Sequence, residues 1–317
     1  MAKYIVKRVI LLIPTVFAVC VITFALMRII PGTAVDQIIS QYTLAGIVKT
    51  REEVEAMLGM DKPATTQFFI WIAGLLKGDL GNSLFQSETV GQIIGKKLPI
   101  TLELSILILV LSNVISIPLG LLCAARQDAV ADNIIRTIAV ILMAIPVFWI
   151  ATLVLVYPAV WWNYAPPANY YSFFERPWQN IQMFLIPGLL GAITQAGIQI
   201  RLVRTMTLEN LRQDYIRTAW AKGASESWAL THHALRNSMI PVVTSIGGAV
   251  AGLIGGSVVL ENMFNIPGIG AAMVNALSNR DYPLVQGCVL IFSIVVMVVN
   301  LVVDIAYKWI DPRVEIE

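Results

Sequence analysis

The stretch RTAWAKGASESWALTHHALRNSMIPVV, Arg217–Val243, connects two apolar regions of the chain. It carries charges, a glycine and two adjacent histidines, whereas 57% of the 317 residues are hydrophobic and only 13% are charged. Soluble domains average about 25% charged residues. The composition therefore predicts a membrane protein, and we expect most of this stretch to form a loop outside the bilayer.

Apolar runs of about 20 residues predict six membrane-spanning helices. They are Val9–Ile30, Leu98–Ala125, Ile134–Val160, Ile181–Ile200, Met239–Leu260 and Leu284–Ile310. Positive residues before the first run also fit a cleaved signal peptide, but its apolar part is too long and no cleavage motif precedes Pro31. We therefore expect an all-α membrane protein that retains its first span.

The spans divide the chain into four parts: a tail and first helix (1–30), a helical insertion on the outer side (31–97), a five-helix core (98–310) and a tail (311–317). The loop Arg201–Arg236 carries six Lys or Arg residues, while Trp161–Asn180 and Glu261–Pro283 carry only Arg176 and Arg280. Because positive loops stay inside, this loop and both termini are expected in the cytoplasm.

Local signals predict helices in the insertion. Thr50 and Glu53 form a capping-box pattern, so a helix is expected over Thr50–Met60 with Gly59 as its stop. Ala64–Leu76 has the pattern of a second, amphipathic helix. Lys77–Ser83 (KGDLGNS) is a turn cluster.

The chain lacks recognisable catalytic patterns. GQIIGKK (Gly91–Lys97) departs from the spacing of a phosphate-binding loop, and His232 and His233 point about 100° apart on a helix, so they cannot share one metal by themselves. The three cysteines have no paired spacing, and a net charge of +2 is too small to suggest nucleic-acid binding. We expect no enzyme activity and no metal or cofactor bound by this chain.

Charged residues inside the spans are few. Arg28 and Glu103 lie near the expected outer ends, where anchoring and a pathway role are both open. Asp304 has Lys308 one turn later, which favours a local ion pair. None predicts a proton relay at mid-membrane, which weakens the case for a secondary transporter.

Two spans carry unusual faces. Thr244, Gly248, Gly252 and Gly256 recur every four residues, which fits helix packing within this chain or against a partner chain, or a place along a pathway. The other face, formed by Gly188, Gly191, Gln195 and Gln199, predicts pathway lining in preference to hydrogen bonding between helices.

The opening stretch predicts a helix, a turn and a second helix. Apolar residues keep a helical spacing from Leu208 to Ala219, and Gly223 can end that helix in a left-handed cap. Ser225 is the expected N-cap of the next helix, with Trp228 three residues on. Such a short helix with an apolar knob fits a groove on a cytoplasmic partner.

These features resemble the permeases of ABC importers, in the branch that moves dipeptides, oligopeptides and nickel complexes. The resemblance rests on Ala219–Gly223 followed by HALRNSMIPVVT (His233–Thr244), and it extends over most of the chain. The further matching stretches are LKGDLGNS (76–83), LPITLEL (98–104), ENMFNIPGIG (261–270), NRDYPLVQG (279–287) and DPR (311–313). The general loop pattern begins Glu-Ala-Ala, where this chain has Arg217, Thr218 and Ala219.

The resemblance implies a type I importer fold and a coupling mechanism. Two homologous permeases would form the pathway in a prokaryotic cell membrane, two cytoplasmic P-loop ATPases would bind ATP and Mg, and an extracytoplasmic solute-binding protein would deliver cargo. The loop 201–238 would dock on the ATPases. The residues implied in docking are Arg217, Ala219, Lys222, Gly223 and Ser225.

The nature of the cargo stays open at this point. Di- or oligopeptides lead, and nickel chelates or oligosaccharides are the alternatives within the same architecture. An ATP-independent secondary transporter is a more distant alternative, and an intramembrane enzyme lacks any catalytic constellation. The aromatic stretch Trp161–Trp178 is better explained by an interfacial belt than by sugar stacking.

Overall fold

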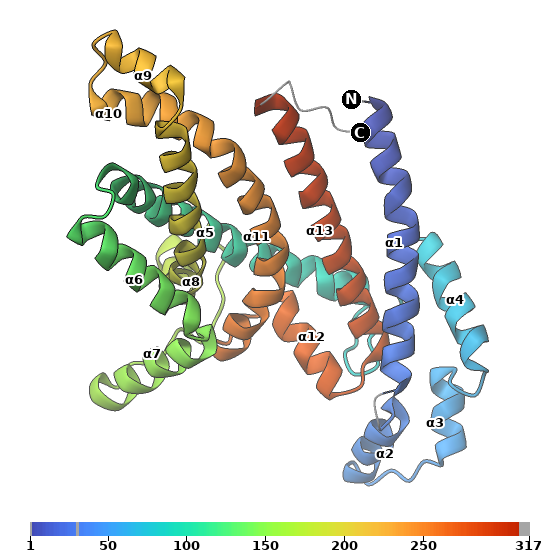
Figure 1. The fold of residues 1–317 in the computed structure, drawn as a ribbon. Coiled ribbons are helices and arrows are strands. Elements are labelled where there is room, and N and C mark those ends of the chain that lie inside the picture. The colour runs from blue at the N-terminus through green and yellow to red at the C-terminus, as the bar shows by residue number, and fades with distance from the viewer. Residues whose placement is uncertain (1, 30–31, 311–317) are drawn as a thin grey trace. The chain divides into compact units, whose positions relative to one another are not determined.

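The computed structural model describes residues 2–29 and 32–310, without the side chains of 2–9, 251, 254, 256, 304 and 306–310. The described residues form helices and turns, apart from an isolated β-bridge between Asn82 and Thr89 (Figure 1). In chain order the elements are α1 (Ala2–Ile29), α2 (Ala34–Leu44), α3 (Arg51–Leu58), α4 (Ala64–Leu76), α5 (Val90–Ala125), α6 (Val130–Ala144), α7 (Val147–Trp162), α8 (Pro177–Leu211), α9 (Asp214–Ala221), α10 (Glu226–Trp228), the π-helical turn η1 (Ala229–Ala234), α11 (Leu235–Met263), α12 (Ile269–Ser278) and α13 (Tyr282–Ile310).

The chain folds as two units. Unit 1 comprises Met1–Thr101 and Pro267–Met297, and unit 2 comprises Leu102–Ile266 and Val298–Glu317. The long helices α5 and α13 contribute residues to both.

Four of the expected spans are long apolar helices: they lie in α1, α5, α8 and α13. The expected span Ile134–Val160 is not one continuous helix, because it covers α6 and α7, which are bent by 91° relative to each other. Pro146 explains the bend. A residue before proline is pushed out of the α region, and Ile145 accordingly has an extended backbone (φ −86°, ψ 124°). Counting this pair as one span gives five among the described residues.

The remaining expected span, Met239–Leu260, lies within α11. This 29-residue helix is continuous despite Pro241, but the side chains at positions 251, 254 and 256 are not described. It therefore stays a predicted span.

The insertion in unit 1 contains three helices. The Thr50–Glu53 capping box and the left-handed Gly59 (φ +66°) are confirmed at the two ends of α3. Helix α2 was not expected, although Thr33 and Asp36 form the same kind of capping box. At the turn cluster, the Asp281 side chain accepts hydrogen bonds from the Ser83 hydroxyl and, at 3.2 Å, from the Leu84 amide.

Helix α4 has the expected bounds but is not amphipathic. It has no buried residue, and Phe69, Ile70 and Leu76 are all more than half exposed. Its Phe68 ring contacts the Phe17 and Phe24 rings of α1 at centroid distances of 6.2 and 5.0 Å, and the two helices lie side by side in Figure 1. We infer that α4 packs along the apolar part of the first span.

A buried ion pair joins α6 to α8 in unit 2. The Arg204 guanidinium donates two hydrogen bonds to the Asp132 carboxylate, at 2.8 and 2.7 Å. Asp132 is fully buried and also accepts from the backbone amide of Asp128 at 2.9 Å. A bidentate pair of this kind fixes the register of two helices. Arg204, which the sequence places in a loop, therefore lies on α8 and has a structural partner.

Candidate functional site

The segment between α8 and α11 breaks at a place that the helical spacing did not predict. Helix α8 continues to Leu211, so Arg201 and Arg204 lie on it and not in a loop. Gln213 is extended (φ −79°, ψ 151°) and α9 begins at Asp214. The expectation of one helix from Leu208 to Gly223 is therefore wrong. An acidic residue in the first turn of α9 favours the new start, because it meets the positive end of the helix dipole.

The turn after α9 is formed as the sequence predicts. Gly223 has φ +86°, its amide donates to the Trp220 carbonyl at 2.9 Å, and the Ala224 amide donates to the Ala219 carbonyl at 3.1 Å. This is the Schellman arrangement, which satisfies the last carbonyls of a helix. The Ser225 hydroxyl then accepts from the Trp228 amide at 3.3 Å and caps α10.

A π-helical turn and an aromatic cluster follow. Within α10 and η1, the Trp228 ring stacks on His232 (4.9 Å, 11°) and meets His233 edge-on (4.7 Å, 81°). Trp228 remains 45% exposed. π-helical turns are rare and occur often at functional sites. Sequence spacing could not reveal this turn, because an α-helix and a π-helix have similar composition.

Two sets of contacts hold the segment on the helices that carry it. Ile216, Ala229 and Ala234 are fully buried and pack with Leu211. The Tyr215 hydroxyl donates to Asn210 at 2.8 Å and accepts from the Asn237 amide at 2.9 Å. Asn210 also donates to Ser238 at 3.1 Å. Residues of α8, α9 and α11 thus share one polar network, so α9 is positioned by both of the long helices (Figure 1).

An open hollow of about 380 Å³ lies at the surface of this segment. Three of the five residues implied in docking, Ala219, Lys222 and Gly223, line it together with Ala224, Trp228 and His233. Arg217 and Ser225 do not line it. The Arg217 side chain is 73% exposed and lies 3.5 Å from the Asp214 carboxylate. A Cβ atom added to Gly223 would meet nothing within 4 Å, so the space outside it is empty in this chain.

The polar face of α8 is packed. A Cβ atom at Gly188 would lie 2.7 Å from Leu107 of α5, and one at Gly191 would lie 2.6 Å from Ile108, so both glycines allow close helix approach. Gln195 is half-buried. Gln199 is fully buried, and neither of its amide atoms has a hydrogen-bond partner among the described residues. Its role in a pathway stays a prediction.

The small residues of α11 differ in their surroundings. Gly248 and Gly252 have nothing within 4 Å of an added Cβ atom, whereas Gly247 would clash with Val303 at 2.5 Å. Thr244 is exposed and donates to the Ile240 carbonyl at 3.0 Å. The surroundings of Gly256 lie outside the described residues. Among the described residues, nothing covers the predicted stripe at Gly248 and Gly252.

Of the other charges singled out from the sequence, Glu103 has polar partners in unit 2. Glu103 accepts hydrogen bonds from Tyr170 at 3.2 Å and from Asn180 at 2.7 Å, which attaches the loop after α7 to α5. Burial, together with the Glu103 carboxylate, raises the pKa of Tyr170 to about 12. The side chains of Asp304 and Lys308 lie outside the described residues. No cluster of three or more metal-ligating side chains occurs in the described part of the chain.

The described residues form a helical protein with several helices long and apolar enough to cross a membrane, and comparison with known proteins identifies its family. Residues 116–316 match the family described as "Binding-protein-dependent transport system inner membrane component", and residues 1–105 match the N-terminal part of that family. The chain belongs to this family of ABC-importer permeases, whose members are transport components and not enzymes.

Curated relatives match over the full length. One relative, from Brucella abortus (strain 2308), is 35% identical over 99% of both chains. Its name assigns it provisionally as a permease of a peptide transport system. The "Dipeptide transport system permease protein DppB" of Lactococcus lactis subsp. cremoris is 33% identical over 100% of both. A solved chain of the MetNI methionine ABC transporter has a TM-score of 0.54 at 17% identity, covering 71% of this chain and 99% of its own. That likeness shows the type I permease fold.

Proposed function

We propose that this permease imports di- or oligopeptides as one half of an ATP-driven, binding-protein-dependent transporter. The observation that carries the proposal is the full-length similarity, at 33–35% identity, to proteins named for peptide or dipeptide transport. Nickel chelates and oligosaccharides would use the same architecture and are the alternatives that the test below must separate.

The segment 214–234 is proposed as the docking element for two cytoplasmic P-loop ATPases, which bind ATP and Mg. Ala219, Lys222 and Gly223 would form the contact surface with Trp228, and Arg217 would add charge at its side. A capped turn that is fixed to both α8 and α11 supports this role. A push on a rigid turn moves the long helices, whereas a push on a flexible loop would be absorbed by the loop.

A second, homologous permease would complete the pathway. The open glycine face of α11, at Gly248 and Gly252, supports helix packing against a partner chain, because small residues permit close backbone approach. Gln195 and Gln199 are proposed to line the pathway or to stabilise its walls. We further propose that both termini and the docking element are cytoplasmic, in the cell membrane of a prokaryote, and that a solute-binding protein delivers cargo from outside.

The test is affinity purification of the chain from its membrane in mild detergent, followed by mass spectrometry. We expect a second permease and P-loop ATPases in the preparation. Reconstituted vesicles that contain the binding protein should take up labelled di- and tripeptides when ATP is present inside. Uptake of nickel chelates or oligosaccharides with no peptide uptake would refute the proposed cargo. A chain that moves solute alone and without ATP would refute the importer assignment.

A further inference from the structure

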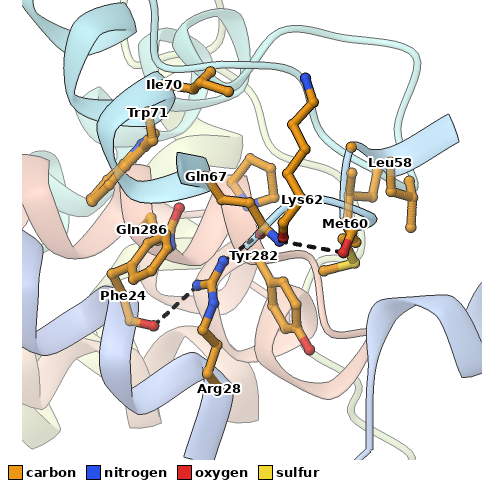
Figure 2. Close-up of a pocket in the computed structure, with 13 residues that line it drawn as sticks. Phe24, Arg28, Leu58, Met60, Lys62, Gln67, Ile70, Trp71, Tyr282 and Gln286 are labelled. Carbon is orange, nitrogen blue, oxygen red and sulfur yellow. Dashed lines mark hydrogen bonds between the residues drawn. The ribbon is translucent and has the colours of Figure 1, made fainter. Parts of the chain in front are cut away.

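A pocket of about 310 Å³ lies within unit 1, at the Arg28 end of α1. Figure 2 shows that its walls come from α1, the α3–α4 connection, α4 and the start of α13. A neighbouring hollow of about 390 Å³ shares Arg28, Met60, Gln67 and Tyr282 with it, so the two spaces adjoin. Neither the docking element nor the pathway candidates contribute to this pocket.

The pocket contains a half-buried cation, Arg28, that forms no ion pair among the described residues. The Glu55 carboxylate lines the adjoining hollow, but it pairs with Arg51 at 2.8 Å. The Arg28 guanidinium lies 3.4 Å from the centroid of the Phe24 ring and donates to the Phe24 carbonyl at 3.2 Å and to Gln67 (Figure 2). Among the described residues, no carboxylate is within ion-pair distance of Arg28, and the lining of the pocket includes no Asp or Glu. Burying a charge without a partner is costly, so the site favours an anion that completes it.

Three further side chains of the pocket, Gln67, Trp71 and Lys62, bear on which ligand would fit. The Gln67 amide nitrogen donates to the Lys62 carbonyl at 2.8 Å, so its oxygen is turned toward Arg28. The indole nitrogen of Trp71 is buried and has no acceptor among the described residues. The ammonium of Lys62 extends away from Arg28 in Figure 2 and adds a second positive charge at the periphery. An anion with several acceptor oxygens could accept hydrogen bonds from these donors.

An apolar surface adjoins the pocket. Ile70 lines the pocket and is 55% exposed, and the neighbouring Phe69 is 68% exposed. The Phe24 and Trp71 rings stack at 6.1 Å, so aromatic surface continues from the guanidinium along α1 and α4. Arg28 is in the last turn of α1, where a span reaches the headgroup region. Apolar surface beside a cation at this depth fits a phospholipid, with its phosphate at Arg28 and its chains along α4.

We propose that the Arg28 pocket binds a phosphate group, and that a phospholipid headgroup supplies it. The guanidinium would hold the phosphate, the Trp71 indole would donate a further hydrogen bond, and the exposed face of α4 would contact the acyl chains. The bound lipid would fasten α4 to the first span. The proposal needs only that the chain lies in a membrane, so it does not depend on which cargo is imported.

The experiment uses the full chain with its attached subunits, stripped of lipid in detergent and titrated with phosphatidylglycerol under native mass spectrometry. We expect a saturable adduct in the wild type, binding roughly 10- to 100-fold weaker in Arg28→Gln because a charged hydrogen-bonding group is lost, and a smaller loss in Trp71→Phe. Lys77→Gln is the matched control, because Lys77 follows α4 directly, is exposed and does not line the pocket. Thermal unfolding of each variant shows that it is folded.

Three further arms identify the ligand. Diacylglycerol, which has the acyl chains without the phosphate, should not bind, and its equal binding would overturn the phosphate site. Glycerol phosphate or inorganic phosphate that binds as tightly as the lipid would support the phosphate site and assign it to a free phosphate. Unchanged lipid binding in folded Arg28→Gln, or displacement of the lipid by a dipeptide in an Arg28-dependent manner, would overturn the proposal.

Discussion

Substitutions at Gly223 separate a structural role of the turn from a docking role. Gly223 has φ +86°, a conformation that costs an L-residue about 1–2 kcal/mol. Its neighbourhood is otherwise empty, since an added Cβ atom meets nothing within 4 Å. Within this chain, Gly223→Ala and Gly223→Leu should therefore cost the same. Gly223→Asn should cost less, because asparagine tolerates the left-handed region.

The two substitutions should differ once a partner is docked. Strain of about 1–2 kcal/mol shifts a local equilibrium by a factor of about 5–30, so Gly223→Ala should reduce transport several-fold. Gly223→Leu carries the same strain and also places a large side chain in the space that an ATPase would occupy. We therefore expect its uptake to fall much further, while the ATPases continue to hydrolyse ATP.

The assay measures substrate uptake and ATP hydrolysis in the same proteoliposomes, with thermal unfolding of each variant as the stability control. The expected order of uptake is wild type, Asn, Ala and then Leu, with equal unfolding temperatures for Ala and Leu. Equal uptake by the Ala and Leu variants would show that the turn matters only for local geometry. Normal uptake by Gly223→Leu at normal abundance would refute docking at this turn.

Three other predictions concern stability and assembly. Arg204→Gln should lower the unfolding free energy by about 3–5 kcal/mol in a chemical denaturation series, because it leaves the buried Asp132 carboxylate without its main partner. The Arg136 side chain is 40% exposed, so Arg136→Gln should change the unfolding free energy by no more than about 1 kcal/mol. Gly247→Ala should destabilise the chain by about 1–3 kcal/mol, because the added methyl group would clash with Val303 of α13. Gly248→Ala should leave the unfolding temperature unchanged but reduce the amount of a second permease that co-purifies with the chain. Hydrogen bonds from the capping threonine of α2 hold the pKa of Asp36 below its ordinary value. The stability that the ionised Asp36 side chain contributes should therefore be present above the unfolded pKa of about 4 and be lost as the pH falls through the lowered pKa. The difference in unfolding temperature between wild type and Asp36→Asn should accordingly shrink from pH 6 to pH 3.

Signals that act over a few residues were predictable from the sequence. The cap of α3, the left-handed Gly223 and the Ser225 cap each depend on neighbours within about four positions, and all three are present. The apolar runs predicted long helices for a similar reason, because bilayer thickness sets their length. The bend at Pro146 also had a local signal, but a count of apolar residues overlooks the effect of proline on the preceding residue.

Contacts between distant residues were not predictable. Asp132 and Arg204 are 72 positions apart, and the Tyr215–Asn237 bond spans 22 positions across a π-helical turn. No spacing rule pairs such residues. The sequence therefore places Arg204 in a loop and gives no signal for the network that positions α9. The sequence also does not show that Arg28 lacks a carboxylate partner among the described residues, because this depends on which side chains α3, α4 and α13 bring near it.

The most direct measurement of the central claim is site-specific cross-linking from the docking element in intact membranes. Lys222→Cys would carry a thiol-linked photoreactive probe, and Lys77→Cys in the insertion would be the control; the three native cysteines are buried. We expect the probe at position 222 to form an adduct with a P-loop ATPase and the probe at position 77 to form none. Transport-competent membranes in which position 222 yields no ATPase adduct would contradict the central claim.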